Sequence, residues 1–223
     1  MAIVEIRDLH YGYGAGEHRN EVLRGLEATF EAGQAYAVTG KSGAGKSTLL
    51  SLLSALTLPQ QGEILFEGKA TASLDPLEYR RRCVAVIYQD FALFPLLNVT
   101  ENIMYPMELC GVPREQALAD ARHLAEQVGL PEELLQRYPS AISGGEQQRV
   151  AIARGMAMDR RLILADEPTG NLDSENSDQI VRLLLEAAHR DGRCVIVVTH
   201  DMDVARQVDH VLQMRDGVLI PVS

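Results

Sequence analysis

The stretch AYAVTGKSGAGKSTLL, residues 35–50, decides the fold class of this chain. A short apolar run is followed by a glycine-rich loop, and then by Lys46, Ser47 and an apolar helical pattern. A strand, such a loop and a helix in this order make the GxxxxGK[ST] arrangement. Its main-chain N–H groups can face one phosphate, and the helix N-terminus adds partial positive charge. The stretch therefore predicts a nucleoside triphosphate site on an α/β fold.

Apolar and β-branched runs on either side of this stretch predict further strands, at residues 3–6, 63–66, 83–88, 162–165, 195–199 and 210–214. Helical patterns lie at residues 45–56, 113–128, 143–158 and 175–190. Their alternation with nearly all-apolar strands favours a mostly parallel sheet. Strand signals lapse between about residues 89 and 158. We therefore expect one domain over residues 1–223, with an α/β core (1–88 and 159–223) and an inserted helical subdomain (89–158).

Two acidic residues, Asp166 and Glu167, directly follow the predicted strand at residues 162–165. Ligands of α/β sheets bind at the carboxyl ends of the strands, so these acids are expected near the glycine-rich loop. There Lys46 would contact the β- and γ-phosphates, Ser47 would ligate Mg²⁺, and Asp166 would hold the ion through water. Glu167 would orient or deprotonate the attacking water.

The overall composition limits the partners of the chain. Its net charge of −10 argues against broad affinity for nucleic acid, because such binding depends on a basic surface. Three widely spaced cysteines predict reduced thiols rather than a disulfide framework or a zinc site. The apolar runs are too short to cross a bilayer, so a membrane role would come through a partner.

A second glycine motif, ISGGEQQR at residues 142–149, distinguishes between the families that share the first one. It resembles the signature of the ABC ATPase superfamily, LSGGQ followed by QQR. Ser143 would cap the following helix. Two positions depart from the pattern, Ile142 for leucine and Glu146 for glutamine. Unless its carboxylate points away, Glu146 is expected to add an unfavourable negative charge near the triphosphate.

Other segments resemble elements of the same superfamily in the same order along the chain. Gln89 follows a predicted strand as the Q-loop glutamine does, and Asp173 ends a segment similar to the D-loop. His200 has the place of the switch histidine. Tyr13 has that of the aromatic residue that stacks on adenine, with Tyr11 as the alternative. The resemblance covers nearly the whole chain. It implies a RecA-like P-loop NTPase core with a mostly parallel sheet, an N-terminal antiparallel β portion and an inserted helical subdomain.

The resemblance also implies a mechanism in which two copies form a head-to-tail dimer with two ATP molecules in its interface. Glu167 would orient or deprotonate the attacking water, and His200 would stabilise charge on the γ-phosphate. Gln89 would couple the metal site to the helical subdomain. The expected ATP-binding residues of one subunit are Tyr13, Gly40, Ser42, Gly43, Ala44, Gly45, Lys46, Ser47 and Thr48. The expected residues from the other subunit are Ser143, Gly144, Gly145, Glu146 and Asp173, and the expected metal ligands are Ser47, Gln89 and Asp166.

Residues 164–173 and 91–107 look like the branch that contains the LolD, MacB and FtsE ATPases. This branch implies a homodimer, or a heterodimer with a related ATPase, at the cytoplasmic face of the cell membrane beneath an integral-membrane permease. The large apolar residues between Phe91 and Met107 have two interpretations. They are either ordinary core of the helical subdomain or a groove that accepts a short helix of the permease.

Two alternatives to a transporter subunit remain at this stage. One is a non-transporting ABC ATPase that regulates an extracytoplasmic process such as cell division, with the same ATPase chemistry. The other is a soluble ABC ATPase acting on DNA or ribosomes. Two features disfavour the second alternative. The chain is acidic overall, and the span between Lys46 and Ser143 is too short to contain a long coiled coil.

Overall fold

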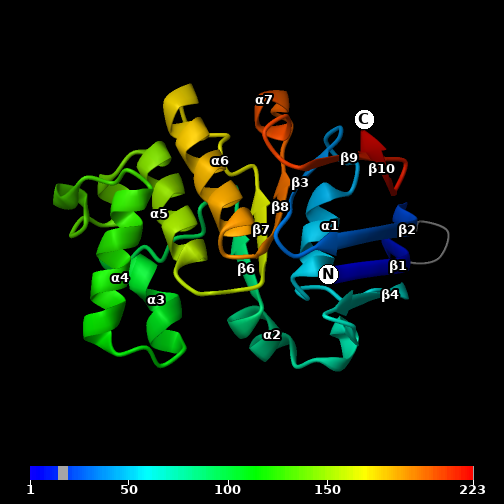
Figure 1. The fold of residues 1–223 in the computed structure, drawn as a ribbon, viewed down its shortest axis with the longest axis horizontal. Helices are drawn as coiled ribbons and strands as arrows, with labels where there is room; N and C mark the ends of the chain where they lie inside the picture. The colour runs from blue at the N-terminus through cyan, green and yellow to red at the C-terminus, as the bar shows by residue number, and fades with distance from the viewer. Residues whose placement is uncertain (15–19, 223) are drawn as a thin grey trace.

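The computed structural model describes residues 1–14 and 20–222 of the chain, which contain two sheets (Figure 1). The larger sheet has six strands in the order β10-β9-β3-β8-β7-β6. Neighbours from β9 to β6 run parallel, and β10 pairs antiparallel with β9. The strands are β3 (Ala35–Thr39), β6 (Val84–Ile87), β7 (Leu162–Asp166), β8 (Cys194–Val198), β9 (His210–Arg215) and β10 (Val218–Val222). The predicted α/β class with a mostly parallel sheet is confirmed.

The smaller sheet is antiparallel, as expected for the N-terminal portion, with the order β2-β1-β4-β5. Its strands are β1 (Ala2–Tyr13), β2 (Asn20–Glu31), β4 (Gln61–Phe66) and β5 (Lys69–Ala70). Strand β1 is much longer than the run predicted at residues 3–6. Gly62 has a φ of 75°, and a Cβ there would come within 2.1 Å of the Asp8 main-chain oxygen. Only glycine fits at this crossing of β1 and β4.

Three helices, α3 (Val99–Leu109), α4 (Arg114–Gln127) and α5 (Gly144–Met156), gather at one end of the molecule, opposite the antiparallel sheet (Figure 1). The others are α1 (Lys46–Leu53), α2 (Pro76–Arg82), α6 (Ser174–His189) and α7 (Met202–Ala205), with 3₁₀ turns η2 (Thr71–Ser73), η3 (Glu132–Leu134) and η4 (Pro139–Ala141). Helix α1 ends before the predicted residue 56, because Ala55 has a left-handed φ of 52°. No helix in the described part of the chain is long and apolar enough to span a bilayer.

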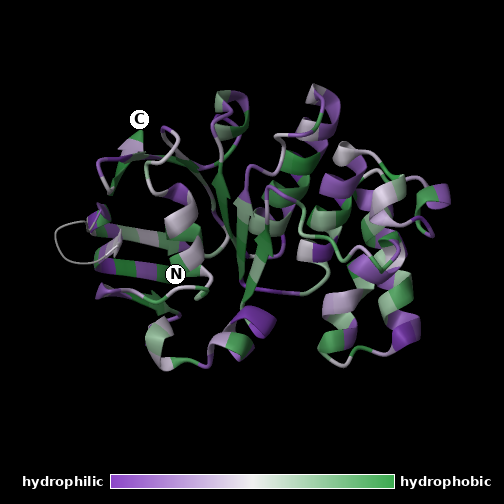
Figure 2. Ribbon diagram, turned by 180° about the vertical axis from the view of Figure 1, so that it is seen from behind, coloured by the Kyte–Doolittle hydropathy of each residue, from purple (hydrophilic) through white to green (hydrophobic). Residues whose placement is uncertain are grey.

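The core lies on both faces of the parallel sheet, whose central strands are hydrophobic along their length (Figure 2). Alternate side chains of β7 belong to different clusters. Leu162 and Leu164 pack with α1 and the antiparallel sheet, whereas Ile163 and Ala165 pack with the helices on the other face. Because side chains alternate along a strand, a strand buried on both faces needs apolar residues throughout. Because these strands are packed on both faces, their carboxyl ends have fixed positions. The polar loops begin at those ends.

Candidate functional site

One cavity of about 460 Å³ lies at the carboxyl ends of four neighbouring strands, in the order β3, β8, β7 and β6. The glycine-rich loop follows β3, Glu167 follows β7, His200 follows β8 and Gln89 follows β6. Tyr13 reaches the cavity from the end of β1. The lining residues are Tyr13, Val22, Gly40, Ser42, Gly43, Gly45, Lys46, Ser47, Thr48, Gln89, Asp166, Glu167 and His200. Most of the candidate residues of one subunit therefore surround one space.

The glycine-rich loop curls around the ammonium group of Lys46. Its Nζ donates to the main-chain oxygens of Gly40 at 2.7 Å and Lys41 at 3.0 Å. Gly45, which precedes α1, has a φ of 107°, and a Cβ there would come within 2.9 Å of Val22. The loop can therefore keep its curvature only with glycine at this position. Ala44 does not line this cavity, but it lines a larger one of about 650 Å³ that shares Gly40, Ser42 and Gly43.

Oxygen donors suited to a hard cation lie beside the loop. Ser47 Oγ donates to Asp166 Oδ2 across 3.5 Å, and Gln89 lines the same cavity. Burial, together with the neighbouring charge of Glu167, raises the pKa of the Asp166 carboxyl. A divalent cation here would favour the ionised carboxylate, because an adjacent positive charge opposes both effects. The residues present therefore fit Mg²⁺, whose preferred ligands are oxygen atoms.

Glu167 is held in a constrained position between β7 and β8. Its backbone is left-handed, with a φ of 47°, and the residue is buried. His200 Nδ1 donates to Glu167 Oε1 at 2.8 Å, and the Thr199 hydroxyl and the His200 main-chain N–H donate to Oε2 at 3.4 Å. The hydrogen bond to Glu167 raises the pKa of His200. A strained backbone that directs a carboxylate into a cavity is a common feature of functional sites.

Tyr13 rather than Tyr11 lines the cavity. The Tyr13 hydroxyl lies 3.2 Å from Thr48 Oγ1, and its side chain remains exposed. Tyr11 packs edge-on against the Tyr13 ring, with 5.3 Å between the ring centroids. Tyr11 therefore positions the neighbouring ring rather than facing the cavity itself.

The second glycine motif lies outside this cavity, at the start of α5. Ser143 caps the helix, and its main-chain N–H and its hydroxyl both donate to Glu146 Oε2, at 2.6 and 2.9 Å. Glu146 N donates in return to Ser143 Oγ at 3.3 Å. The Glu146 carboxylate is thus turned toward its own helix terminus, where the helix dipole stabilises negative charge. In this orientation, the Glu146 carboxylate should repel a bound triphosphate less than a carboxylate pointing toward the phosphates would.

Asp173 also lies outside the cavity, and it is linked to the same helix. Asp173 caps α6 by accepting from Asn176 N at 2.9 Å and Nδ2 at 2.8 Å. Arg149 of α5 donates to Asn176 Oδ1 at 2.9 Å. A Cβ on Gly145 would lie 3.4 Å from the Asn171 main-chain oxygen. The two motifs expected to act in trans therefore lie in contact with each other, and Ser143, Gly144 and Asp173 are exposed there.

Two residues of the site were not among those predicted. Thr199 is fully buried and donates to the carboxylate of Glu167, and Val22 lines the cavity from β2. Thr199 directly follows the apolar run of β8, so its position after a strand was a usable signal. Nothing local to Val22 indicates its place, because this depends on the pairing of β1 and β2.

Comparison with known proteins places the chain in a family. The family model described as ABC transporter matches residues 23–170. LolD, the lipoprotein-releasing system ATP-binding protein of Shewanella frigidimarina, is 39% identical over 100% of this chain and 94% of its own length. MacB 2, a macrolide export ATP-binding/permease protein of Aeromonas hydrophila subsp. hydrophila, is 40% identical over 96% of this chain and 33% of its own length.

A solved structure agrees with these relatives. The ATP-binding cassette MJ0796, a dimer in a post-hydrolysis state bound to ADP and Pi, superposes with a TM-score of 0.90 at 34% identity. The superposition covers 97% of this chain and 96% of that cassette. The chain therefore belongs to the ABC transporter family, as an ATP-binding subunit of the LolD and MacB type.

Proposed function

We propose that this chain hydrolyses ATP in a head-to-tail dimer with Mg²⁺, and that the cycle drives a membrane permease. The observation that carries the proposal is the cavity at the strand ends, where the glycine-rich loop, Asp166, Glu167 and His200 meet. A triphosphate brings negative charge that the loop N–H groups and Lys46 can neutralise. The carboxylate of Glu167 is aimed at the same space.

Within one subunit, the side chains would divide the work as follows. Lys46 would exchange its two carbonyl partners for phosphate oxygens. Glu167, held by Thr199 and His200, would orient the attacking water and accept its proton. Ser47, Gln89 and Asp166 would hold Mg²⁺, which when bound would screen the charge of the β- and γ-phosphates. The His200 side chain is 76% exposed, so it can turn toward a phosphate without breaking the core.

The residues at the start of α5 support a dimer. Ser143 and Gly144 are exposed and do not line the cavity of their own subunit. They could cover a γ-phosphate only in a second copy, and the similar cassette MJ0796 was solved as a dimer. In such a dimer, Ser143 to Glu146 and Asp173 of one copy would face the nucleotide of the other. We propose a symmetric homodimer, because each copy carries both halves of the site.

The permease partner is proposed from the relatives. MacB 2 is named as an ATP-binding/permease protein, and this chain spans one third of its length. LolD is named as the ATP-binding protein of a releasing system. We propose that a separate permease subunit supplies the corresponding membrane part here. The chain would then be peripheral, at the cytoplasmic face, where ATP is available.

The catalytic proposal can be tested by measuring phosphate release and molar mass with purified protein. Glu167→Gln should slow hydrolysis about a hundredfold or more and should form an ATP-dependent dimer. Adding Ser143→Arg to Glu167→Gln should leave ATP binding intact but keep the protein monomeric. Lys41→Ala, on the same loop, serves as the matched control with wild-type hydrolysis. Wild-type turnover by Glu167→Gln, or a dimer that tolerates Ser143→Arg, would contradict the proposal.

The partner can be tested by capturing tagged Glu167→Gln from detergent-solubilised native membranes with and without ATP. An integral-membrane protein with a large extracytoplasmic domain, retained more strongly with ATP, would support the permease. Recovery of ribosomes or DNA without any membrane protein would overturn it.

A further inference from the structure

The strand end that carries Tyr13 is held by a contact that lies outside the nucleotide cavity. Tyr13 is the last residue of β1, and its side chain is 54% exposed at the edge of the cavity. The residue before it, Gly12, is buried. Glycine has more backbone freedom than any other residue, so the direction of the Tyr13 ring depends on what fixes Gly12.

Gly12 is fixed by the side chain of Gln60, which directly precedes β4. The pairing of β1 with β4 reaches His10, opposite Gln61. Beyond this point, Gly12 N donates to Gln60 Oε1 at 3.0 Å, and Gln60 Nε2 donates to the Gly12 oxygen at 2.9 Å. A carboxamide offers a donor and an acceptor, as a peptide group does. The Gln60 side chain therefore continues the pairing of the two strands by one residue.

Both main-chain groups of Gly12 would lose this partner without Gln60. Buried N–H and C=O groups need hydrogen bonds, because an unpaired group has also lost its hydration. Gly12 would then have to turn toward water, and its neighbours Tyr11 and Tyr13 would turn with it. Since these two rings pack edge-on, 5.3 Å apart, a turn at Gly12 would also change their contact.

The segment that runs from the glycine-rich loop to β4 contacts the end of β1 twice. Helix α1 starts at Lys46 in that loop, and the Thr48 hydroxyl on its first turn lies 3.2 Å from the Tyr13 hydroxyl. Gln60, in the connection between α1 and β4, holds the main chain of Gly12. The groups proposed to bind the phosphates and the aromatic ring beside the cavity are therefore joined by one stretch of chain.

We infer that Gln60 is a positioning residue for the base of ATP. Its carboxamide holds Gly12, and through Gly12 it holds the Tyr13 ring in the orientation that stacks on adenine. Gln60 does not line the cavity, so it acts through Gly12 rather than by touching the nucleotide. The inference rests on the proposed function, because it assumes that ATP occupies this cavity.

The first test compares Gln60→Ala with the wild-type protein in ATP binding and in hydrolysis. A base that stacks less well on its aromatic partner binds more weakly, so the Kd and KM for ATP should rise about five- to tenfold. The kcat at saturating ATP should stay at the wild-type value, because the groups around the γ-phosphate are untouched. An unchanged Kd, or a loss confined to kcat, would overturn the inference.

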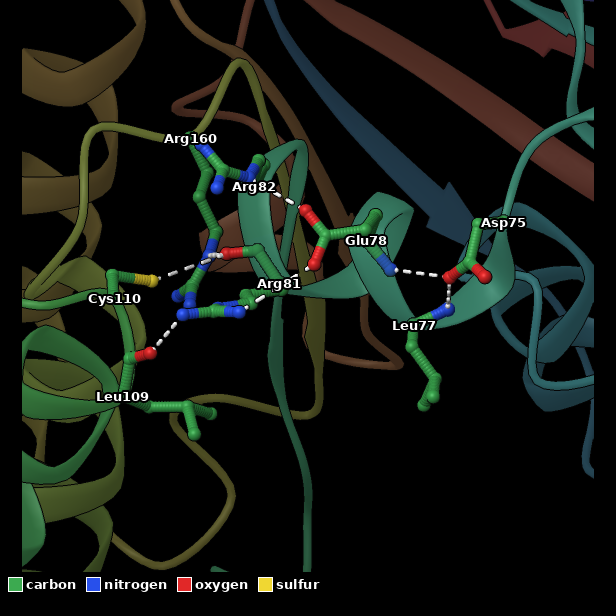
Figure 3. Close-up of polar contacts among 8 residues, drawn as sticks. All are labelled: Asp75, Leu77, Glu78, Arg81, Arg82, Leu109, Cys110 and Arg160. Carbon is green, nitrogen blue, oxygen red and sulfur yellow. Dashed lines mark hydrogen bonds and ion pairs between the residues drawn. The ribbon is translucent and has the colours of Figure 1, made fainter.

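Asp75 supplies a matched control for the loss of hydrogen bonds. Its Oδ1 accepts from Leu77 N at 2.9 Å and from Glu78 N at 2.8 Å at the start of α2 (Figure 3). Like Gln60, Asp75 is an exposed residue whose side chain makes two hydrogen bonds to the main chain. Asp75→Ala should therefore keep the wild-type Kd and KM, measured at physiological salt to screen the change in charge. Weaker ATP binding by Asp75→Ala, equal to that of Gln60→Ala, would count against a specific role of Gln60.

A double-mutant cycle tests whether Gln60 acts through the Tyr13 ring. In the Tyr13→Ala background there is no ring to position, so adding Gln60→Ala should change the Kd for ATP by less than about twofold. If Gln60→Ala weakens ATP binding as much in this background as in the wild-type protein, Gln60 acts by another route and the inference is refuted.

The orientation of the ring can be followed directly by fluorescence, because the chain contains no tryptophan. Tyr13→Trp places a single indole at the end of β1. Adding Gln60→Ala should lower the fluorescence anisotropy of this indole in nucleotide-free protein, whereas adding Asp75→Ala should leave it unchanged. Equal anisotropy with and without Gln60→Ala would show that Gln60 does not hold the ring.

Failure of this inference can be distinguished from failure of the proposed function. If the wild-type protein binds and hydrolyses ATP while Gln60→Ala matches it in Kd and in anisotropy, only the role of Gln60 is refuted. If the wild-type protein binds no ATP, the proposed function fails, and the role of Gln60 in ATP binding fails with it whatever the anisotropy shows.

Discussion

At the scale of single residues, the contact between His200 and Glu167 can be tested by titration. Because Glu167 Oε1 accepts from His200 Nδ1 at 2.8 Å, it stabilises the protonated imidazole and raises the pKa of His200 above 6.5. The contribution to stability is full below pH 6.5 and is lost as the pH rises through the raised pKa. Histidine NMR titration should show the His200 pKa falling toward 6.5 in Glu167→Gln. An unchanged pKa would contradict the hydrogen bond.

Glu146 gives a second test at this scale. Its carboxylate accepts two hydrogen bonds from Ser143 at the start of α5. Removing the acceptor in Glu146→Ala should lower the free energy of unfolding by about 1 kcal/mol, and Glu146→Gln should cost less because an acceptor remains. Glu115 stands in the first turn of α4 without a side-chain cap there, so Glu115→Ala is the control. Denaturant melts of the three variants check the order, and equal losses would refute the cap.

At the scale of elements, Asn102 joins helix α3 to the loop that precedes it, at residues 94–97. Its side chain is fully buried, accepts from Phe94 N at 2.8 Å, and donates to the oxygens of Phe94 at 3.1 Å and Leu97 at 2.9 Å. Asn102→Ala should cost about 1–3 kcal/mol of unfolding free energy, because partly buried main-chain groups lose their partner. Arg122→Ala, on the exposed surface of α4, should stay within about 0.5 kcal/mol by thermal or chemical melts.

A small loss in Asn102→Ala would mean that water or a relaxed loop replaces these hydrogen bonds. A large loss would show that these hydrogen bonds hold the loop at residues 94–97 against α3.

The central strands β3, β7 and β8 were predictable because they are buried on both faces and are therefore apolar along nearly their whole length. Strand β2 was not predicted. It carries Glu21, Arg24 and Glu27 among its apolar residues, and its pairing with β1 shifts register several times, so no simple alternation appears. Helix α3 was missed although Asn98 and Glu101 form a capping box, a signal present in the sequence. Its interior proline, Pro106, obscured the helical pattern.

At the scale of the whole molecule, the candidate site depends on strand order. The sequence places Gln89, Asp166 and His200 after three separate strands, but it does not state that β6, β7 and β8 are neighbours. Resemblance to the family implied only that these residues share one site, and the sheet order brings their three strands side by side. The roles given to these residues stay predictions. That Ser143 lies outside the cavity of its own subunit is likewise a property of the assembled fold.

The whole molecule should be stabilised by ATP if the cavity binds the nucleotide only in the folded state. At an ATP concentration one hundred times its Kd, the gain is about 2.7 kcal/mol, which corresponds to a rise in Tm of about 5–10 °C for a chain of this size. Lys46→Ala removes the ammonium group that is proposed to contact the phosphates, and it should abolish the rise in a thermal scan. Glu167→Gln should keep it.

Lys41→Ala is the control for this experiment, because Lys41 belongs to the same loop and its exposed side chain does not line the cavity. It removes the same charge from the molecule, so a general electrostatic attraction of ATP would weaken equally in both variants. If Lys41→Ala keeps the rise and Lys46→Ala loses it, the position of the ammonium group decides binding. If both lose it, or neither does, the cavity at the strand ends is not the place where ATP stabilises the fold.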